Sequence, residues 1–462
     1  MFEAKTYAKR RDILRKSVGS GLILLPGHDD SPMNYTANAY HFRQDSTFLY
    51  YFGLDSPGLA AVLDADAGQD ILFGDDIGIE DIIWMGYLPT LRDRAAGVGV
   101  GRTAGLNDLG PLLQEAQRKG RTIHHLPPFR PETFLKLEKW MGIAPDAAKA
   151  KSSAALVKAV VAQRSVKSDE EVVEIETALK TTARMYDSAM RMAQPGIWER
   201  DIAGRVDGLA LAGGGGTAFP TILTKNGQIL HNHEHSNRLK KGDLLVVDAG
   251  AASPLHYASD VTRTVPVGGT FSTRQLEVYE IVLKAQETAI KAIRPGIKFK
   301  DVHFQSARVI AGGLKGIGLM KGDVEEALHQ GAHALFFPHG LGHMLGLDVH
   351  DMENLGEQHV GYDDSVQRSA QFGLAYLRLA KALRPGYVVT VEPGVYFIPA
   401  LIEKWRNDGK FKDFIAYDKL GAYLAFGGIR IEDDILVTKD GHRVLGRPIP
   451  KKPARIAEAV KL

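Results

Sequence analysis

Short apolar runs alternate with helical stretches along residues 1–160. Residues 22–25 are Leu-Ile-Leu-Leu and end at a Pro-Gly pair, and residues 59–63 are Leu-Ala-Ala-Val-Leu and end in the polar segment 64–70. Apolar runs of this length that stop at turn residues are typical of buried strands. Strands that alternate with helices in this way predict an α/β fold for the first third of the chain.

A well-marked helix start follows near residue 168. Ser168 and Glu171 have the spacing of a capping box, in which each side chain bonds the other residue's backbone N–H. Apolar residues then recur at helical spacing until residues 195–196, a Pro-Gly pair that closes the segment. Because the chain turns mostly polar just before this helix, we expect one domain over residues 1–164 and a second over residues 165–462.

A faint internal repeat runs through this second part. Residues 194–197 (Gln-Pro-Gly-Ile) recur as residues 294–297 (Arg-Pro-Gly-Ile), each between two helical patterns. A strand-like run ending in Asp248 lies downstream of the first copy, and one ending in Glu392 lies downstream of the second. A duplication would give two α/β halves with carboxylates converging between them. Coincidence is the alternative, because Pro-Gly ends many helices.

Two aspartates flank a predicted hairpin. Asp248 ends an apolar strand, and Asp260 lies in the alternating run of residues 259–264, which predicts a second strand. Antiparallel pairing of these strands would bring the two side chains close together, because strand side chains repeat every second residue. Two acids on one inward face repel each other unless a cation or a proton lies between them. A structural acid pair is the alternative.

Three histidines gather between residues 339 and 350. His339, His343 and His350 are interleaved with glycines, which disfavour a helix here. We therefore expect a strand or loop whose glycines let the backbone approach a site. A lone histidine is more often structural, but three in such a short segment indicate a functional site.

Glu392 and Glu432 complete a set of four acids around one histidine. Mostly oxygen ligands with one imidazole suit a hard divalent ion such as Mn²⁺ better than a metal that prefers thiolates. Four acids exceed the needs of a single catalytic zinc, which usually has three protein ligands. Two metals about 3.5–4 Å apart, bridged by carboxylates, would use them all.

The composition excludes several classes of function. Among 462 residues, Lys and Arg total 57 and Asp and Glu total 55, with the two signs interspersed, so we expect no nucleic-acid partner and no acidic membrane surface. The chain has no cysteine, which excludes thiolate metal sites and cysteine nucleophiles and fits a cytoplasmic location. No apolar run approaches the roughly 20 residues that a membrane helix needs.

Five short strings resemble those of the pita-bread metallopeptidases, specifically the proline-specific branch of aminopeptidase P and prolidase. In chain order they are Val-Asp-Ala-Gly, Ser-Asp-Val-Thr-Arg-Thr, His-Gly-Leu-Gly-His, Val-Glu-Pro-Gly and Arg-Ile-Glu-Asp. Residues 42–46 (Phe-Arg-Gln-Asp-Ser) and 51–53 (Tyr-Phe-Gly) are similar to the N-terminal domain of that branch. The resemblance implies an N-terminal α/β domain and a catalytic pita-bread domain, with two pseudo-symmetric halves around a curved antiparallel sheet.

The resemblance also implies roles for individual residues. The ligands of two divalent metals, Mn²⁺ with Co²⁺ or Zn²⁺ as alternatives, would be Asp248, Asp260, His343, Glu392 and Glu432. His231 matches a histidine that lines the proline pocket, and Arg430 matches an arginine that orients a ligand or substrate. His339 and His350 match histidines near the scissile carbonyl.

One further match concerns assembly. Trp84 resembles a tryptophan that reaches the active site of the neighbouring subunit, and plain packing is its alternative. The family implies a homodimer, with a tetramer as the alternative.

The implied reaction is hydrolysis of the Xaa-Pro bond of a short peptide. That bond is a tertiary amide without an N–H, so a peptidase that docks its substrate as a strand loses a donor. A metal pair avoids this problem because it acts on the carbonyl. Glu392 would carry the proton, and His350 would help to stabilise the oxyanion.

Arg378 separates two versions of this activity. Residues 376–378 (Tyr-Leu-Arg) and 397–402 resemble prolidases, in which an arginine holds the free carboxylate of the C-terminal proline. We therefore expect an Xaa-Pro dipeptidase. The alternative is an Xaa-Pro aminopeptidase, with Arg378 on a solvated helix. A non-catalytic pita-bread binding module is a remote alternative, because such modules typically lose metal ligands.

Overall fold

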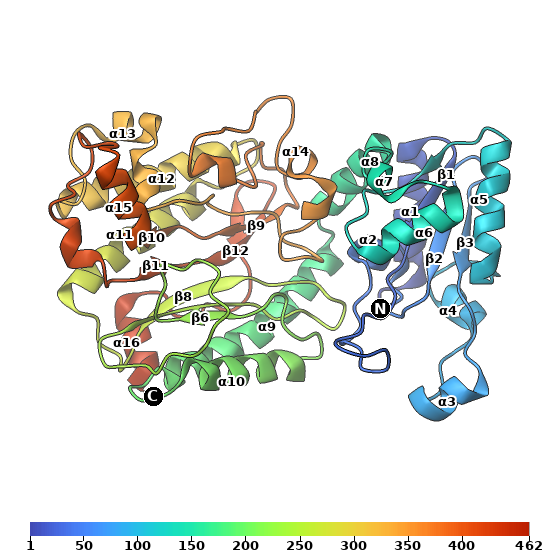
Figure 1. The fold of residues 1–462 in the computed structure, drawn as a ribbon, viewed down its shortest axis with the longest axis horizontal. Helices are drawn as coiled ribbons and strands as arrows, with labels where there is room; N and C mark the ends of the chain where they lie inside the picture. Colours follow the sequence, from blue (N-terminus) through green and yellow to red (C-terminus); the bar gives the residue numbers. More distant parts are fainter. Residues whose placement is uncertain (462) are drawn as a thin grey trace. The chain divides into compact units, whose positions relative to one another are not determined.

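The computed structural model describes residues 1–461, which form two compact units (Figure 1). The first unit comprises residues 1–164 together with residues 354–359. The second comprises residues 165–353 and the described chain from Val360 onward. The chain passes from the first unit to the second between Arg164 and Ser165, and the short segment 354–359 is an addition to the first unit that no local pattern indicated.

The first unit is built on a five-stranded sheet with the order β4-β3-β2-β1-β5. Its strands are β1 (Leu22–Pro26), β2 (Ala60–Asp64), β3 (Gln69–Phe73), β4 (Arg102–Ala104) and β5 (Ile123–His124). The two apolar runs expected to be strands are β1 and β2, which pair antiparallel with Leu24 opposite Val62. Alternate residues of β1, β2 and β3 pack with Leu113 and Trp140 in one core, so helices α5 and α6 cover one face of the sheet.

The helices of the first unit are α1 (Ala4–Val18), α2 (Ser46–Phe52), α3 (Ile79–Met85), α4 (Leu91–Gly97), η1 (Leu106–Asp108), α5 (Leu109–Arg118), α6 (Pro131–Met141), α7 (Pro145–Ala148) and α8 (Ala154–Ser165). The start of α2 explains the motif at residues 42–46. The Asp45 side chain accepts the Phe48 N–H and caps this helix, while the buried Gln44 side chain accepts the His28 N–H at 2.6 Å. The motif therefore fixes a turn in this unit.

The second unit begins with the predicted capping box. The Ser168 N–H donates to Glu171 Oε2 at 3.0 Å, and α9 runs over Asp169–Met192. The remaining helices of this unit are α10 (Glu199–Ala212), α11 (Thr273–Ala292), α12 (Phe299–Gly316), α13 (Val324–Gln330), η2 (Ala332–Leu335), η4 (Leu374–Tyr376), α15 (Pro399–Asn407), η5 (Leu420–Tyr423) and α16 (Pro453–Lys461). Two further elements, η3 (Glu353–Leu355) and α14 (Glu357–Val360), lie around the segment 354–359. Across residues 1–461, no helix combines the length and apolar content needed to cross a membrane.

Three antiparallel sheets form the centre of the second unit. They are β6-β7-β8 (Ile222–Thr224, Leu244–Ala249, Val261–Pro266), β13-β12-β9 (His442–Val444, Asp433–Val437, Val388–Val391) and β10-β11 (Gly394–Tyr396, Gly428–Arg430). In the view of Figure 1, these strands lie between the α9–α10 pair and the α11–α12 pair. The Glu432 N–H donates to the Thr262 carbonyl at 3.0 Å, which links β8 to the segment between β11 and β12.

The two copies of the repeat form the same turn. Gly196 and Gly296 have φ values of 94° and 83°, a region that glycine adopts readily because it has no Cβ. The Gly196 N–H donates to Leu239 O and the Gly296 N–H to Leu383 O, both at 2.8 Å. Each turn thereby joins its pair of helices to the chain that leads into one sheet, as two related halves require.

Two histidines are fully buried in the second unit. The rings of His303 and His333 lie 6.4 Å apart between centroids, and the His303 ring stacks on Phe337 at 5.2 Å. Burial lowers the pKa of His303 to about 3 and the pKa of His333 to about 4. Both rings are therefore neutral at pH 7 and resist protonation in the folded protein.

Acid should destabilise the protein through these two rings. Because their folded-state pKa values lie below the roughly 6.5 of an unfolded histidine, the unfolded chain binds more protons as the pH falls, and stability falls with it. Each ring contributes up to about 1.4 kcal/mol per pH unit between its two pKa values. His303→Phe, which keeps a ring against Phe337, should show a shallower loss of unfolding free energy in urea titrations between about pH 6 and pH 5. Equal slopes in the two proteins would contradict this account.

Candidate functional site

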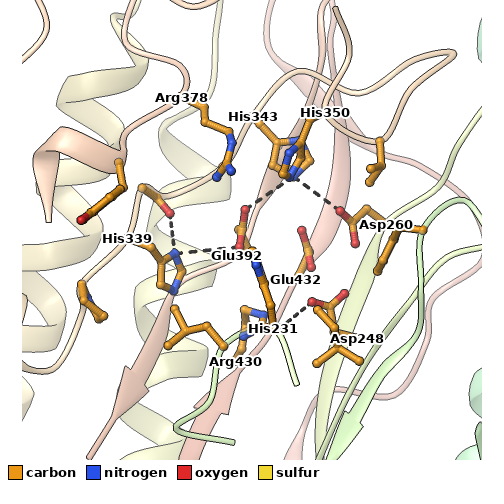
Figure 2. Close-up of a pocket in the computed structure, with 18 of the residues that line it drawn as sticks. His231, Asp248, Asp260, His339, His343, His350, Arg378, Glu392, Arg430 and Glu432 are labelled. Atoms are coloured by element: carbon orange, nitrogen blue, oxygen red, sulfur yellow. Dashed lines mark hydrogen bonds and ion pairs between the residues drawn. The ribbon is translucent and has the colours of Figure 1, made fainter. Parts of the chain in front are cut away.

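A cavity of about 550 Å³ opens in the second unit (Figure 2). Ten of the eleven residues singled out from the sequence line it, namely His231, Asp248, Asp260, His339, His343, His350, Arg378, Glu392, Arg430 and Glu432. The eleventh, Trp84, is not among the lining residues. It lies on α3 of the first unit, where its side chain is 83% exposed.

The β7–β8 hairpin brings the two aspartates to the cavity. Asp248 of β7 pairs in register with Thr262 of β8, so Asp260, two residues before Thr262, shares its face of the sheet. Gly250 makes this approach feasible, because a Cβ there would lie 1.7 Å from the Ser259 carbonyl oxygen. Both aspartates are buried. The hairpin expected from the sequence is therefore present.

The histidine segment is irregular, as its glycines indicated. It runs beside β9, where the Thr390 N–H donates to the His343 carbonyl at 3.0 Å and the Glu392 N–H donates to the Leu341 carbonyl at 2.8 Å. A Cβ at Gly342 would lie 2.1 Å from the Thr390 carbonyl oxygen, so glycine is needed for this close approach. The pairing places His343 beside Glu392.

The buried acids converge in a way that suits a cation. One potential ligand atom from each of Asp260, His343 and Glu432 lies within 4.8 Å of the other two. His343 Nε2 is 3.5 Å from Asp260 Oδ2 and 3.6 Å from Glu392 Oε1. Within the described chain, one buried oxygen of each of Asp248, Asp260 and Glu432 has no hydrogen-bond partner. Because unpartnered buried oxygens are costly, these residues fit a divalent metal with oxygen and imidazole ligands.

The electrostatics of the cluster lead to the same conclusion. Burial, reinforced by the neighbouring carboxylates, raises the pKa of Asp260 and of Glu432 well above the usual range. Burial also raises the pKa of Glu392 to about 7. Carboxylates packed this closely must share protons or a cation.

Arg430 is held within this acidic cluster. Its guanidinium donates to the Asp248 carboxylate, to the Tyr396 hydroxyl at 3.0 Å and to Thr262 Oγ1 at 3.1 Å. The Tyr396 hydroxyl also lies 2.8 Å from His339 Nε2, so one buried tyrosine links Arg430 to His339. Sequence reasoning did not single out Tyr396. Its place two residues after a Pro-Gly turn, beside a proposed ligand, was the available signal.

His350 and Arg378 stand side by side at the upper edge of the site in Figure 2. The His350 ring packs against the His343 ring, with centroids 4.2 Å apart and an interplanar angle of 66°. Arg378 follows the short helix η4, and its side chain is directed into the cavity instead of lying on a solvated helix. Both residues contact Glu353, which the sequence did not indicate.

The loop that carries His350 is anchored by a buried ion pair. Lys167 Nζ lies 2.9 Å from Asp351 Oδ2, and each side chain is only 1% exposed. Gly346 packs against the pair, since a Cβ there would lie 2.4 Å from the same carboxylate oxygen. The Asp351 N–H also donates to the Met344 carbonyl at 3.0 Å. These contacts fix the chain immediately after His350.

The remaining walls are largely apolar. They include Phe219, Pro220, Ile222, Leu230, Pro338, Val349, Phe372, Tyr376, Ile398 and Leu401, with His233 at one side. Apolar walls with a few convergent polar groups are typical of a small-ligand site. Tyr376, Ile398 and Leu401 lie in the two segments that resemble prolidases, whereas the other apolar wall residues come from scattered segments that no local pattern singled out.

Comparisons with known proteins identify the family. The sequence pattern of metallopeptidase family M24 matches residues 173–439, more than half of the chain. The chain belongs to the M24 metallopeptidases. The pattern of the aminopeptidase P N-terminal domain matches residues 7–124. The resemblance seen in the five motifs is thus confirmed.

Individual M24 relatives indicate which kind of peptidase this chain is. The Xaa-Pro aminopeptidase of Escherichia coli strain K12 is 30% identical over 465 residues, covering 97% of this chain and 96% of that protein. A probable Xaa-Pro aminopeptidase of Sordaria macrospora is 31% identical, covering 100% of this chain and 96% of the relative. The chain is accordingly a proline-specific metallopeptidase.

Solved structures of M24 peptidases have the same fold as this chain. An Escherichia coli aminopeptidase P variant in complex with substrate superposes with a TM-score of 0.82 at 28% identity, covering 100% of this chain and 99% of that one. Pseudomonas aeruginosa aminopeptidase PepP gives a TM-score of 0.82 at 29% identity, with coverage of 100% and 98%. A zinc-substituted Escherichia coli aminopeptidase P in complex with product also matches, at a TM-score of 0.81. The two-domain fold is confirmed, and divalent metal use by this M24 peptidase is supported.

These comparisons also correct one expectation. The sequence patterns around Arg378 led us to expect a dipeptidase, but the relatives are Xaa-Pro aminopeptidases, which favours the alternative. They also favour an enzyme over the non-catalytic binding module.

Proposed function

We propose that this M24 peptidase is an Xaa-Pro aminopeptidase, which removes the N-terminal residue from peptides that have proline in second position. The supporting observation is that the acids and histidines converge in one cavity. The chain is also similar over almost its whole length to an Xaa-Pro aminopeptidase. Residues 1–164 would form the N-terminal domain of this peptidase type, and residues 165–462 the catalytic domain. The absence of cysteine supports a cytoplasmic location.

The proposed metal ligands are Asp248, Asp260, His343, Glu392 and Glu432. Two Mn²⁺ ions suit this oxygen-rich set best, with Co²⁺ or Zn²⁺ as alternatives. When bound, the metals would act as Lewis acids on the scissile carbonyl and on water. The unpartnered buried oxygens of Asp248, Asp260 and Glu432 support this assignment.

Other residues of the cavity would handle the proton and the peptide. Glu392, with its pKa raised to about 7, is suited to take up and release a proton near neutral pH. His339 and His350 would lie near the scissile carbonyl, and His231 would line the proline pocket. Arg430 holds the Asp248 carboxylate in place and faces the same cavity.

The position of Arg378 supports a second candidate, an Xaa-Pro dipeptidase. Its guanidinium lines the cavity close enough to Glu392 to lower the pKa of that residue, although burial outweighs this effect. An arginine in this place can bind a substrate carboxylate through two parallel hydrogen bonds. Such a contact would favour peptides that end at proline.

Hydrolysis of Ala-Pro and Ala-Pro-Ala by metal-stripped protein supplied with excess Mn²⁺ tests both candidates. Faster cleavage of Ala-Pro-Ala is expected for the aminopeptidase. Cleavage confined to Ala-Pro would contradict it and support the dipeptidase. If neither peptide is cleaved by protein that has bound metal, both candidates are wrong.

We also propose that the protein forms a homodimer, with a tetramer as the alternative, and that Trp84 contributes to the association. On and just after α3, Ile83, Trp84, Met85 and Tyr87 are each at least 70% exposed. An apolar patch of this kind is a common feature of protein interfaces.

Trp84→Ala should weaken self-association while changing the free energy of unfolding of the monomer by no more than about 0.5 kcal/mol, because the side chain is exposed. Analytical ultracentrifugation measures the first effect and urea unfolding the second. Tyr35→Ala, which removes an exposed aromatic side chain of the same unit outside α3, is the control. Unchanged association of the Trp84 variant would contradict the proposal.

A further inference from the structure

We propose that Glu353 is a positioning residue that holds His350 and Arg378 together, and that it thereby sets the affinity of the cavity for peptides with a free carboxylate after proline. The inference rests on the proposed function, because it concerns how the same site selects its peptide. It adds a residue that neither the motifs nor the comparisons indicate.

The carboxylate of Glu353 contacts both His350 and Arg378 without lining the cavity itself. Its Oε2 lies 2.6 Å from His350 Nδ1, and its Oε1 lies 3.5 Å from Arg378 Nε. His350 and Arg378 line the cavity, whereas Glu353 does not. Any effect of Glu353 on a bound peptide therefore passes through these two partners.

The charge of Glu353 determines the direction of the first bond. Its hydrogen bond with His350 lowers the pKa of this glutamate to about 2, so the side chain is a carboxylate at neutral pH. A carboxylate only accepts hydrogen bonds, and His350 Nδ1 must therefore carry the donated proton. Because the His343 ring also packs against the His350 ring, with centroids 4.2 Å apart, two neighbours hold His350 in place.

The second contact orients Arg378. Glu353 engages Nε, which leaves the two terminal nitrogens of the guanidinium for the cavity. The backbone here is tightly constrained, since a Cβ at Gly361 would lie 1.7 Å from the Arg378 carbonyl oxygen. The Ala380 N–H also donates to the Gly361 carbonyl at 2.8 Å. With its backbone fixed and Nε held, Arg378 presents its outer edge to a substrate carboxylate.

A strained turn delivers Glu353 to this position. Met352 is buried and has φ 63°, in the left-handed region that bulky residues rarely adopt. The turn brings the Glu353 N–H to the His350 carbonyl at 3.2 Å. The Lys167–Asp351 pair holds the residue between His350 and Met352. Strain that the surrounding structure maintains is common at functional sites.

Steady-state kinetics of the Mn²⁺-loaded protein with Ala-Pro, Ala-prolinamide and Ala-Pro-Ala test the proposal. Ala-prolinamide has the size of Ala-Pro but lacks the carboxylate, so the pair isolates the contact with Arg378. If Ala-Pro is not turned over, its inhibition constant against Ala-Pro-Ala takes the place of KM.

Glu353→Ala should raise the KM or inhibition constant of Ala-Pro about tenfold, since a charged hydrogen bond loses its support, and leave the KM of Ala-prolinamide within about twofold. It should also lower kcat for each cleaved substrate about tenfold, because His350 loses its partner. Glu353→Gln keeps an acceptor for His350 and should restore most of kcat but not the affinity for Ala-Pro.

Glu325→Ala is the matched control, because it removes an exposed glutamate whose Oε2 accepts from Arg308 at 2.7 Å, and its constants should match the wild type. Tighter binding of Ala-Pro by Glu353→Ala, an equal change in the KM or inhibition constant of all three compounds, or no change in these constants would each overturn the inference while wild-type turnover upholds the proposed function. A wild-type protein that binds Mn²⁺ and cleaves none of the three would overturn both.

Discussion

Glutamine in place of Glu392 should abolish cleavage of Ala-Pro-Ala while the protein stays folded. Glutamine has nearly the same size, but it neither takes up the proton nor supplies the charge of a metal ligand. The glutamate side chain is only 19% exposed, its Oε1 lies 3.6 Å from His343 Nε2, and burial raises its pKa to about 7. Loss of a general acid–base group of this kind lowers rates by about 10²–10⁴-fold. We expect the upper end of that range.

The measurement is kcat with bound metal determined on the same sample and folding checked by circular dichroism. Glu403→Gln is the control, because Glu403 is exposed on α15 and does not line the cavity. Near-normal turnover in Glu392→Gln with metal bound would rule out the proton-carrying role. Loss of both bound metal and turnover would indicate that the main role of Glu392 is to bind metal.

Asp351→Asn should destabilise the second unit more than any surface substitution. It would leave the Lys167 ammonium buried without its counter-charge, at 1% exposure and packed against Gly346. Removing one partner of a buried ion pair typically costs about 3–5 kcal/mol. Since the pair anchors the chain next to His350, turnover should fall as well.

Urea unfolding of Asp351→Asn, Lys167→Met and the double variant tests this expectation. The double variant should lose less stability than the two single losses added together, because no unpaired charge remains buried. Asp408→Asn is the matched control. Asp408 Oδ2 lies 3.0 Å from Lys404 Nζ, but both side chains are exposed, so this ion pair should contribute no more than about 1 kcal/mol to the free energy of unfolding. A loss as small as that of the control would contradict the structural role of the buried pair.

Local signals in the sequence account for much of the architecture. The apolar runs at residues 22–25 and 59–63, the capping box at Ser168 and the two Pro-Gly turns depend on neighbours a few residues apart, and all are present in the structure. Glycines beside the acids and histidines also marked where the backbone approaches closely, as at Gly250 and Gly342. Ten candidates named from motifs consequently line one cavity.

Contacts between distant segments could not be predicted in this way. Lys167 and Asp351 are 184 residues apart, and Arg430 and Asp248 are 182 residues apart. Tyr396 has no periodic pattern that would mark it as a link between His339 and Arg430. Such pairs form only after sheets and loops pack. The residues next to them in the sequence therefore do not indicate which distant residue each will contact.

The sequence by itself determined the strands, the first helix of the catalytic part, the family and the candidate ligands, because each depends on short-range spacing. Only the tertiary structure decided that Arg378 faces the cavity, that Glu353 joins it to His350, and that a buried ion pair anchors their loop. The local sequence around a lysine or an arginine does not distinguish a position on a solvated helix from one in a pocket. The role of such a residue depends on the desolvation and the partner that folding supplies.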